Sequence, residues 1–173
     1  VYDRQNAYRV LLNQLDEPKR VADEEFILRG TPFARFNAQV FMTTGNSVIE
    51  MIGNQTTAMK TDDADGWKAG KDLETYLRYL YVLVPDSKQI YKYERLSNRY
   101  GPPVAYNVNG DLTGALDMTI DGSVYVLREG GIVVKLLRGE AQKFELANAP
   151  EGALLTATKM FKVTEGNFYF LDP

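Results

Sequence analysis

The sequence contains no cysteine and no histidine. Zinc sites built from these residues, thiol nucleophiles and the Ser-His-Asp or Cys-His catalytic pairs are therefore excluded, because each needs a side chain that this chain lacks. We expect no cofactor. Neither disulfides nor free thiols exist to indicate a redox compartment.

Long apolar runs and an excess of one charge are also missing. No run approaches the ~18–20 residues that a membrane-spanning helix needs, so we expect no membrane insertion by this segment. The net charge is −3 with both signs interspersed, which argues against a nucleic-acid partner. A length of 173 residues predicts a single domain over residues 1–173. The chain does not begin with Met, and no signal-peptide layout follows Val1, so we interpret it as a piece of a longer protein. We favour an extracytoplasmic location for it, as part of a larger anchored protein.

A short apolar phrase recurs along the chain. Its copies are LYVL at 80–83, VYVL at 124–127, FYFL at 168–171 and a fainter VFM at 40–42. The central aromatics are 40, 44 and 44 residues apart, at Phe41, Tyr81, Tyr125 and Tyr169. A second set repeats at steps of 42, at Val48, Ile90 and Ile132. A β-forming run that returns every ~40–50 residues predicts a repeated sheet module, of which the propeller blade is the commonest.

The segments between these copies are short β-forming runs separated by Gly, Pro and Asn, which predicts an all-β fold. Asp121-Gly122 has the chemistry of a tight hairpin turn. Residues 72–79 fit either a strand or a short helix, and their place in the repeat favours the strand. We also expect strands over 142–146 and 157–163. The predicted architecture is a β-propeller or propeller fragment of about four four-stranded units, and the alternative is a two-sheet β-sandwich.

Three segments carry a family resemblance. Tyr81–Asp86 with Gln89–Tyr93, followed by Ala115–Leu127, resembles bacterial NHL/YVTN-type β-propeller repeats. The pattern is similar to propeller regions of uncharacterised bacterial proteins related to metal-dependent serine/threonine phosphatases. The resemblance is strong over residues 76–173 and weaker over 1–75. It implies four-stranded blades and a binding or scaffolding role, and no catalytic residue can be transferred, because the phosphatase aspartate motifs are not found.

The two ends of the chain suggest a closure hypothesis. We interpret each phrase as the first strand of its unit, so that 168–171 begins a unit that 1–36 could complete. Pairing of 168–171 with 7–12 would close a ring and remove exposed sheet edges.

The stretch from Thr61 to Asp72 partly matches a calcium-binding loop. Asp63, Asp65 and Asp72 occupy loop positions 3, 5 and 12, but position 1 is Thr61 and position 12 is not Glu. We interpret the stretch as a solvated acidic loop and keep these three residues only as weak metal candidates.

Trp67 and Tyr100 lie in predicted loops, where binding residues concentrate. They are therefore our candidates for contact with a protein or small ligand at the blade loops. We expect alanine at either position to weaken partner capture and to leave stability nearly unchanged.

Four carboxylates at turn positions could act as acids or bases, namely Asp86, Asp117, Asp121 and Glu165. Their repeated placement favours capping and turn hydrogen bonds instead. We therefore expect a non-enzymatic interaction or ligand-binding module of a larger bacterial protein. The alternatives are a propeller-type lyase or glycosidase that uses carboxylate and Tyr residues, and a structural spacer.

Overall fold

The computed structural model describes residues 6–7, 10–11, 14–15, 17–20, 33–36, 38–42, 47–52, 55–163 and 166–172. Regular structure in these ranges is β-strand, apart from two short 3-10 turns, η1 (Pro85–Ser87) and η2 (Glu129–Gly131). The predicted all-β class is confirmed. Within the same ranges, no helix is long and apolar enough to cross a membrane.

The larger sheets follow one another along the chain, and we number them I to IV. Sheet I contains β5 (Phe33–Phe36), β6 (Ala38–Met42), β7 (Val48–Ile52) and β8 (Gln55–Thr61), with β12 (Arg99–Tyr100) added in parallel beside β8. Sheet II contains β9 (Asp72–Tyr76), β10 (Tyr79–Val84), β11 (Gln89–Glu94) and β13 (Val104–Ala105). Sheet III contains β14 (Ala115–Ile120), β15 (Val124–Arg128), β16 (Ile132–Leu137) and β17 (Glu140–Gln142). Sheet IV contains, among the described residues, the two strands β18 (Lys159–Lys162) and β19 (Phe168–Leu171).

Two small pairs precede sheet I. β1 (Asn6–Ala7) pairs with β4 (Lys19–Arg20), and β2 (Val10–Leu11) pairs with β3 (Gln14–Leu15). The strand that we expect over 7–12 is therefore represented by parts of β1 and β2. Residues 25–28 form a further short β-forming run that the sequence predicts as a strand, and they lie outside the described residues.

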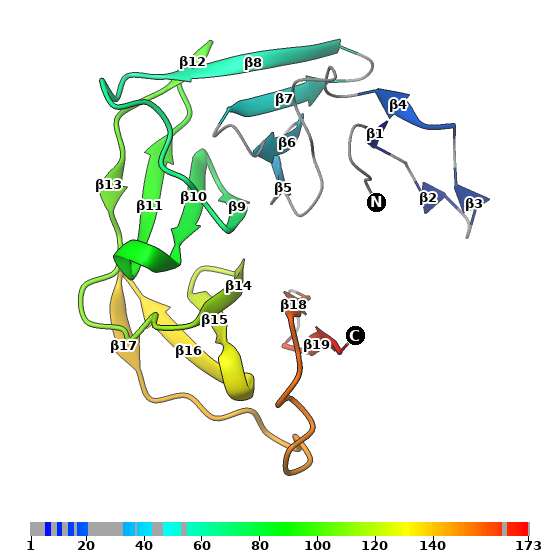
Figure 1. The fold of residues 1–173 in the computed structure, drawn as a ribbon, viewed down its shortest axis with the longest axis vertical. Helices are drawn as coiled ribbons and strands as arrows, with labels where there is room; N and C mark the ends of the chain where they lie inside the picture. Colours follow the sequence, from blue (N-terminus) through cyan, green and yellow to red (C-terminus); the bar gives the residue numbers. More distant parts are fainter. Residues whose placement is uncertain are drawn as a thin grey trace.

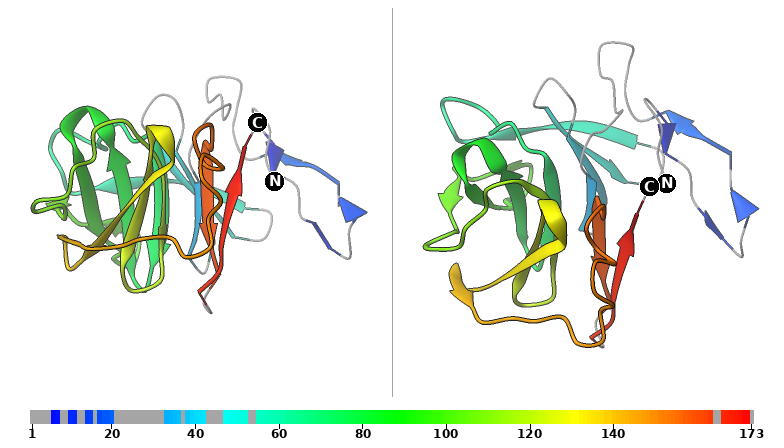
Figure 2. Two further views of the ribbon diagram at one scale, coloured as in Figure 1. Left: turned by 90° about the horizontal axis from the view of Figure 1, so that it is seen from below. Right: turned by 60° about the horizontal axis from the view of Figure 1, so that its bottom comes forward.

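The four sheets are arranged around a common centre. Figure 1 shows β5, β9, β14 and β18 nearest this centre, with β8, β13 and β17 at the periphery. The first strand of each sheet lies beside the first strand of the next, β5 beside β9, β9 beside β14, and β14 beside β18. The views in Figure 2 show the same succession of sheets ending at the β18–β19 hairpin.

The first two strands of sheets II, III and IV pair in equivalent registers. Asp72 lies opposite Leu83, Asp117 opposite Leu127, and Lys159 opposite Leu171. Opposite residues of an antiparallel pair share one face of the sheet, and the next pair along lies on the other face. We call the face with Tyr81, Tyr125 and Tyr169 the forward face. The rear face carries Val82, Val126 and Phe170.

The forward face of each sheet packs on the rear face of the next. Tyr81 and Leu83 of sheet II are buried against Met118, Val124 and Val126 of sheet III. Tyr125 and Leu127 of sheet III are buried with Met160 of sheet IV, where Phe168 and Phe170 also pack. The rear face of sheet II packs on Val40, Met42 and Val48 of sheet I. Because burial of one such side chain stabilises the fold by about 1.5–3 kcal/mol, these three interfaces form the core.

The structure corrects the position of the recurring phrase within its unit. We expect the phrase to be the first strand, but 79–84 and 124–128 are second strands that pair with β9 and β14. The expected strand near 72–79 is confirmed as β9 (Asp72–Tyr76). The turn from β9 to β10 uses Leu77 at φ 54°, a conformation that usually requires Gly or Asn, so its sequence carries no turn signal.

The alignment of the faintest copy is also wrong by one residue. Val40 and Met42 are buried against sheet II and therefore occupy the positions of Tyr81 and Leu83. The prediction instead aligns Phe41 with Tyr81. A shift of one residue moves every side chain of a strand to the opposite face, so the packing reveals what spacing alone does not.

The end of the chain differs from the expected four-stranded unit. The strand expected over 142–146 ends at Gln142, and no strand is assigned from there to Lys159. The strand expected over 157–163 forms as β18, but it pairs with β19 rather than with sheet III. Among the described strands β19 pairs only with β18, so the hypothesis that 168–171 pairs with 7–12 is not borne out by them, and no ring closure is found.

Candidate functional site

Trp67 packs inward. Its Nε1 donates a hydrogen bond to the carbonyl of Met59 at 3.0 Å. Its ring centroid lies 4.8 Å from that of Tyr93 and 5.3 Å from that of Tyr100. The side chain is half-buried against the interface of sheets I and II, so it covers the core.

Tyr100 is buried, which contradicts its expected place on an exposed loop. It is 1% exposed, and its hydroxyl donates to Glu50 Oε1 at 2.7 Å. Arg95 donates to both oxygens of Glu50, at 2.7 and 2.8 Å. Burial and the Glu50 carboxylate raise the pKa of Tyr100, so the hydroxyl keeps its proton. These three residues connect sheets I and II, and Tyr100 presents no surface to a partner.

The structure does not bring the weak metal candidates together. Asp63 accepts the backbone N–H of Asp65 at 3.2 Å and forms an ion pair with Lys68 at 3.0 Å, which lowers the pKa of Asp63. Asp72 is instead buried in β9, where it accepts the backbone N–H of Met118 at 2.8 Å. In the described ranges, no group of three or more acidic side chains is arranged to hold a metal ion.

The turn carboxylates fall into different environments. Asp121 accepts the N–H of Ser123 at 3.1 Å in the β14–β15 turn, as we expect, and forms an ion pair with Lys162 at 2.5 Å. Asp86 is exposed in η1. Asp117 is buried in a strand, and Glu165 lies outside the described residues.

Asp117 belongs to a charge cluster on the inner strands, one of two candidate sites. Its Oδ1 lies 2.7 Å from Lys159 Nζ, and its Oδ2 accepts the N–H of Met160 at 2.6 Å. Lys159 Nζ also lies 3.9 Å from Asp72 Oδ1. Asp72, Asp117 and Lys159 occupy equivalent positions in sheets II, III and IV, so the cluster follows directly from the repeat.

The carboxyls of this cluster have raised pKa values. Burial and the nearby Asp117 raise the pKa of Glu74 to about 8. Burial also raises the pKa of Asp72 and that of Asp117, against the lowering effect of Lys159. Such shifts are typical of catalytic acids, but they also arise in structural networks. The hydrogen bonds to Met118 and Met160 hold neighbouring sheets together and give the cluster a structural role.

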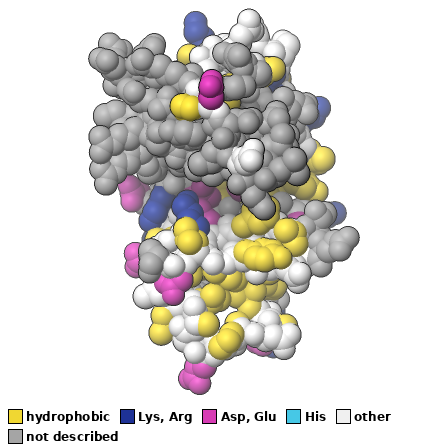
Figure 3. Space-filling model, turned by 90° about the vertical axis from the view of Figure 1, so that its right-hand side faces the viewer, with side chains coloured by type: hydrophobic (Ala, Val, Ile, Leu, Met, Phe, Trp, Pro, Cys, Tyr) yellow, Lys and Arg dark blue, Asp and Glu magenta, His cyan; other side chains and the backbone are white. Residues whose placement is uncertain are grey.

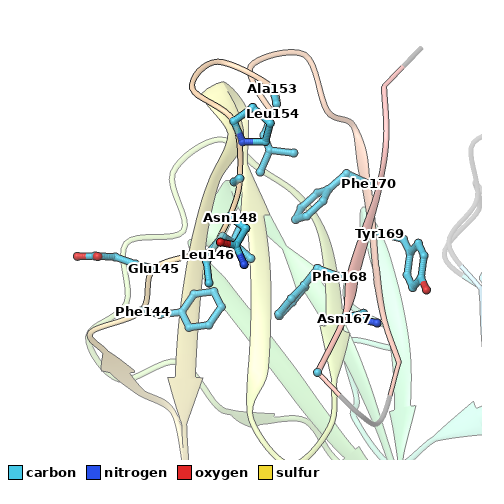
Figure 4. A pocket seen from close by; sticks show the side chains of 14 residues that line it. Phe144, Glu145, Leu146, Asn148, Ala153, Leu154, Asn167, Phe168, Tyr169 and Phe170 are labelled. Atoms are coloured by element: carbon cyan, nitrogen blue, oxygen red, sulfur yellow. The ribbon is translucent and has the colours of Figure 1, made fainter.

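The second candidate is a cleft of about 680 Å³ between sheets III and IV. The loop from Phe144 to Leu154 forms one side, and residues 166–170 form the other. Figure 4 shows Phe144, Phe168 and Phe170 pointing into the space between the sheets, whereas Tyr169 points away from it. We call this cleft the aromatic pocket.

The rings of the aromatic pocket contact one another and Tyr125 beneath them. The centroid of Phe168 lies 5.0 Å from Tyr125, 5.7 Å from Phe144 and 6.2 Å from Phe170. Lys162 Nζ lies 5.5 Å from the Phe168 centroid and 5.7 Å from that of Tyr125. These contacts fix the aromatic rings in place, and a rigid apolar wall binds ligands at a lower entropy cost than a mobile one.

The lining of the aromatic pocket is mostly apolar. Apolar side chains dominate, with Leu146 and Leu154 beside the three phenylalanines, and the polar groups include the side chains of Asn148 and Asn167. Glu145 also borders the cleft, but its side chain points outward in Figure 4. This arrangement suits an apolar or aromatic group with a few hydrogen-bonding atoms at its rim.

No protein-family model, curated protein or solved structure matches the chain.

The sequence pattern does not predict the aromatic pocket. Phe168 and Phe170 belong to the recurring phrase and are interpreted there as strand residues. Phe144 falls in the expected strand 142–146. The usable signal is alternation, because Phe168 and Phe170 share one face of β19 and Tyr169 takes the other.

Proposed function

We propose that the chain is a non-enzymatic binding module whose aromatic pocket accepts an apolar or aromatic side chain of a protein partner. The observation that carries this proposal is the open, aromatic-lined cleft between sheets III and IV. Pockets of this size and lining are typical ligand sites, and aromatic anchors dominate protein recognition. The predicted partner site thus moves from Trp67 and Tyr100 to Phe144, Phe168 and Phe170.

The module is, on this proposal, an arc of propeller-type blades. Three features support this interpretation: the sheet period near 44 residues, the first strands gathered at a common centre, and the forward-on-rear packing of successive sheets. The resemblance of Tyr81–Asp86 and Ala115–Leu127 to NHL/YVTN-type repeats is consistent with it. A propeller-type scaffold places binding loops between blades, which is where the aromatic pocket lies.

A small aromatic probe tests the proposed function. N-acetyl-L-phenylalaninamide should bind with a dissociation constant of about 1 mM, given about 0.3 kcal/mol per heavy atom. Methyl NMR signals of Ala153 and Leu154 should shift as the probe is added, because both residues line the cleft. Absence of saturable shifts at these methyl groups would contradict the proposal.

A pocket-filling variant provides the matched test. Ala153→Leu adds three carbons at the cleft wall without removing any core contact, and it should abolish the shifts at Leu154. Ala105→Leu makes the same change at an exposed position of β13 and should leave binding intact. Equal binding by both variants would place the probe elsewhere.

The enzymatic alternative has one observation in its favour. Asp72, Glu74 and Asp117 gather on the inner strands with raised pKa values. Against it, hydrogen bonds to backbone N–H groups occupy Asp72 Oδ2 and Asp117 Oδ2, and Asp117 Oδ1 is held by Lys159. These contacts occupy three of the four carboxylate oxygens of the two aspartates. An acid or base must instead be free to reach its substrate.

A further inference from the structure

The forward face of sheet IV is exposed, whereas the forward faces of sheets II and III are buried against the following sheet. Tyr81 and Tyr125 are 7% and 5% exposed, because each packs on the following sheet. The equivalent Tyr169 is 57% exposed. Phe161 and Leu171, which share its face, are each 59% exposed. Figure 3 shows hydrophobic side chains gathered on the side of the molecule that carries β18 and β19.

In the part of the chain that the structure describes, the edge of β19 is also unpaired. The equivalent strands β10 and β15 each pair on both sides, with β9 and β11 and with β14 and β16. Among the described strands, β19 pairs with β18 alone. An unpaired strand edge beside an apolar face is a template for the addition of another strand.

The two complete repeats show what kind of strand belongs there. In sheet II, Lys92 lies opposite Tyr81, between Tyr91 and Tyr93. In sheet III, Lys135 lies opposite Tyr125, between Val134 and Leu136. The Nζ of Lys135 lies 5.6 Å from the Tyr125 centroid, a distance at which a cation is attracted to the ring. Both strands have the order apolar, apolar, lysine, apolar, at 90–93 and at 133–136.

We propose that β19 is a docking site for an extended segment with this apolar–apolar–lysine–apolar order, which adds antiparallel to its open edge. The lysine lies opposite Tyr169, as Lys92 and Lys135 lie opposite their tyrosines. Main-chain hydrogen bonds supply affinity, and the alternating side chains select the segment. The docking site uses the edge and forward face of sheet IV, whereas the aromatic pocket lies on its rear face, so the two sites are separable.

A peptide taken from the chain itself serves as the probe. We use acetylated and amidated QIYKYE, the sequence of residues 89–94, with a fluorescent label. Its anisotropy should rise to saturation as the full chain is added. Tyr169→Lys should weaken binding by at least about tenfold, because it removes the ring and places a second cation opposite the lysine of the probe. Val104→Lys introduces the same residue at a valine with the same 57% exposure on the edge strand β13 and should leave binding unchanged.

Backbone methylation separates strand pairing from simple hydrophobic contact. We use two peptides, one N-methylated at the odd-numbered residues and the other at the even-numbered residues. Alternate N–H groups of a strand point to opposite edges, so each peptide has one edge blocked. One of the two methylated peptides should lose binding and the other should keep it. Equal binding by the two methylated peptides, or absence of saturable binding by unmethylated QIYKYE, would overturn the proposal.

Self-association is a distinct outcome of the same design. If sedimentation shows a dimer of the chain that Tyr169→Lys dissociates and QIYKYE does not, then a second copy covers this face and the proposal is wrong. Loss of peptide binding without loss of N-acetyl-L-phenylalaninamide binding would remove the docking site and leave the proposed function intact.

Discussion

Asp117 occupies the position in β14 that Asp72 occupies in β9, and each carboxylate accepts a hydrogen bond from a methionine backbone N–H in the following sheet. Asp72 reaches Met118 at 2.8 Å, and Asp117 reaches Met160 at 2.6 Å. The repeat therefore includes a buried polar bond between neighbouring sheets as well as apolar packing. Such bonds fix the register of one sheet on the next, because a buried N–H without a partner is costly.

Removal of one of these bonds should destabilise the fold. Asp117→Ala leaves the N–H of Met160 without its acceptor and Lys159 without its closest carboxylate, so we expect a loss of about 3 kcal/mol in the free energy of unfolding. Urea unfolding followed by circular dichroism measures it. Asp86→Ala, at an exposed position of η1, should change the free energy by less than about 0.5 kcal/mol. A similar small effect of both variants would argue against the inter-sheet bond.

The raised pKa of Glu74 predicts an unusual pH dependence. Its pKa is about 8 in the folded chain and 4.5 in the reference state, so folding takes up a proton between these values. Stability should therefore be highest near pH 4.5 to 5 and fall as pH rises toward 8, in the same direction as Asp72 and Asp117, whose pKa values are also raised. Melting temperatures measured from pH 5 to 9 give the slope.

Glu74→Gln should flatten this slope, because the amide keeps the shape of the protonated acid and does not titrate. Glu94→Gln, at a half-exposed position beside Arg78, is the matched control and should keep the slope. A melting temperature that rises with pH across the window would contradict the pKa assignment.

Tyr100 should contribute to stability. Tyr100→Phe removes the hydroxyl that donates to Glu50, so we expect a loss of about 1–2 kcal/mol in the free energy of unfolding. Tyr169→Phe makes the same change on an exposed ring and should have almost no effect. Chemical denaturation of both variants tests this role, and an unchanged stability of Tyr100→Phe would show that the hydrogen bond to Glu50 does not stabilise the fold.

Two glycines with left-handed torsions should differ in their tolerance of alanine. Gly139 has φ 88°, and an added Cβ would collide with the carbonyl oxygen of Tyr106. Gly130 has φ 78°, but an added Cβ would meet no atom within 4 Å. Gly130→Ala should cost about 1 kcal/mol from backbone strain alone, and Gly139→Ala should cost clearly more. Thermal melting ranks the two, and the reverse order would contradict the packing of Tyr106 on this turn.

The all-β class and the repeat period could be predicted because both are carried by local alternation and spacing. Which strand comes first in each unit could not be predicted. The β9–β10 turn uses Leu77 in a left-handed conformation, so no glycine marks this turn in the sequence. The inner-strand cluster could not be predicted for a related reason, because the sequence places Asp72 at the junction of an acidic loop and a strand and places Lys159 in a different unit from its ion-pair partner Asp117. The aromatic pocket depends on the path of the loop that carries Phe144, which tertiary contacts with Tyr125 determine.

Selective tyrosine modification tests the central relationship most directly. The account predicts that tetranitromethane nitrates Tyr169 rapidly and leaves Tyr81 and Tyr125 protected, as read by peptide mass spectrometry. The reason is that Tyr169 is exposed, with no sheet after it among the described residues, whereas the other two tyrosines are buried. Addition of QIYKYE should then slow nitration of Tyr169. Equal nitration of the three tyrosines, or protection of Tyr169 in the chain alone, would contradict the account.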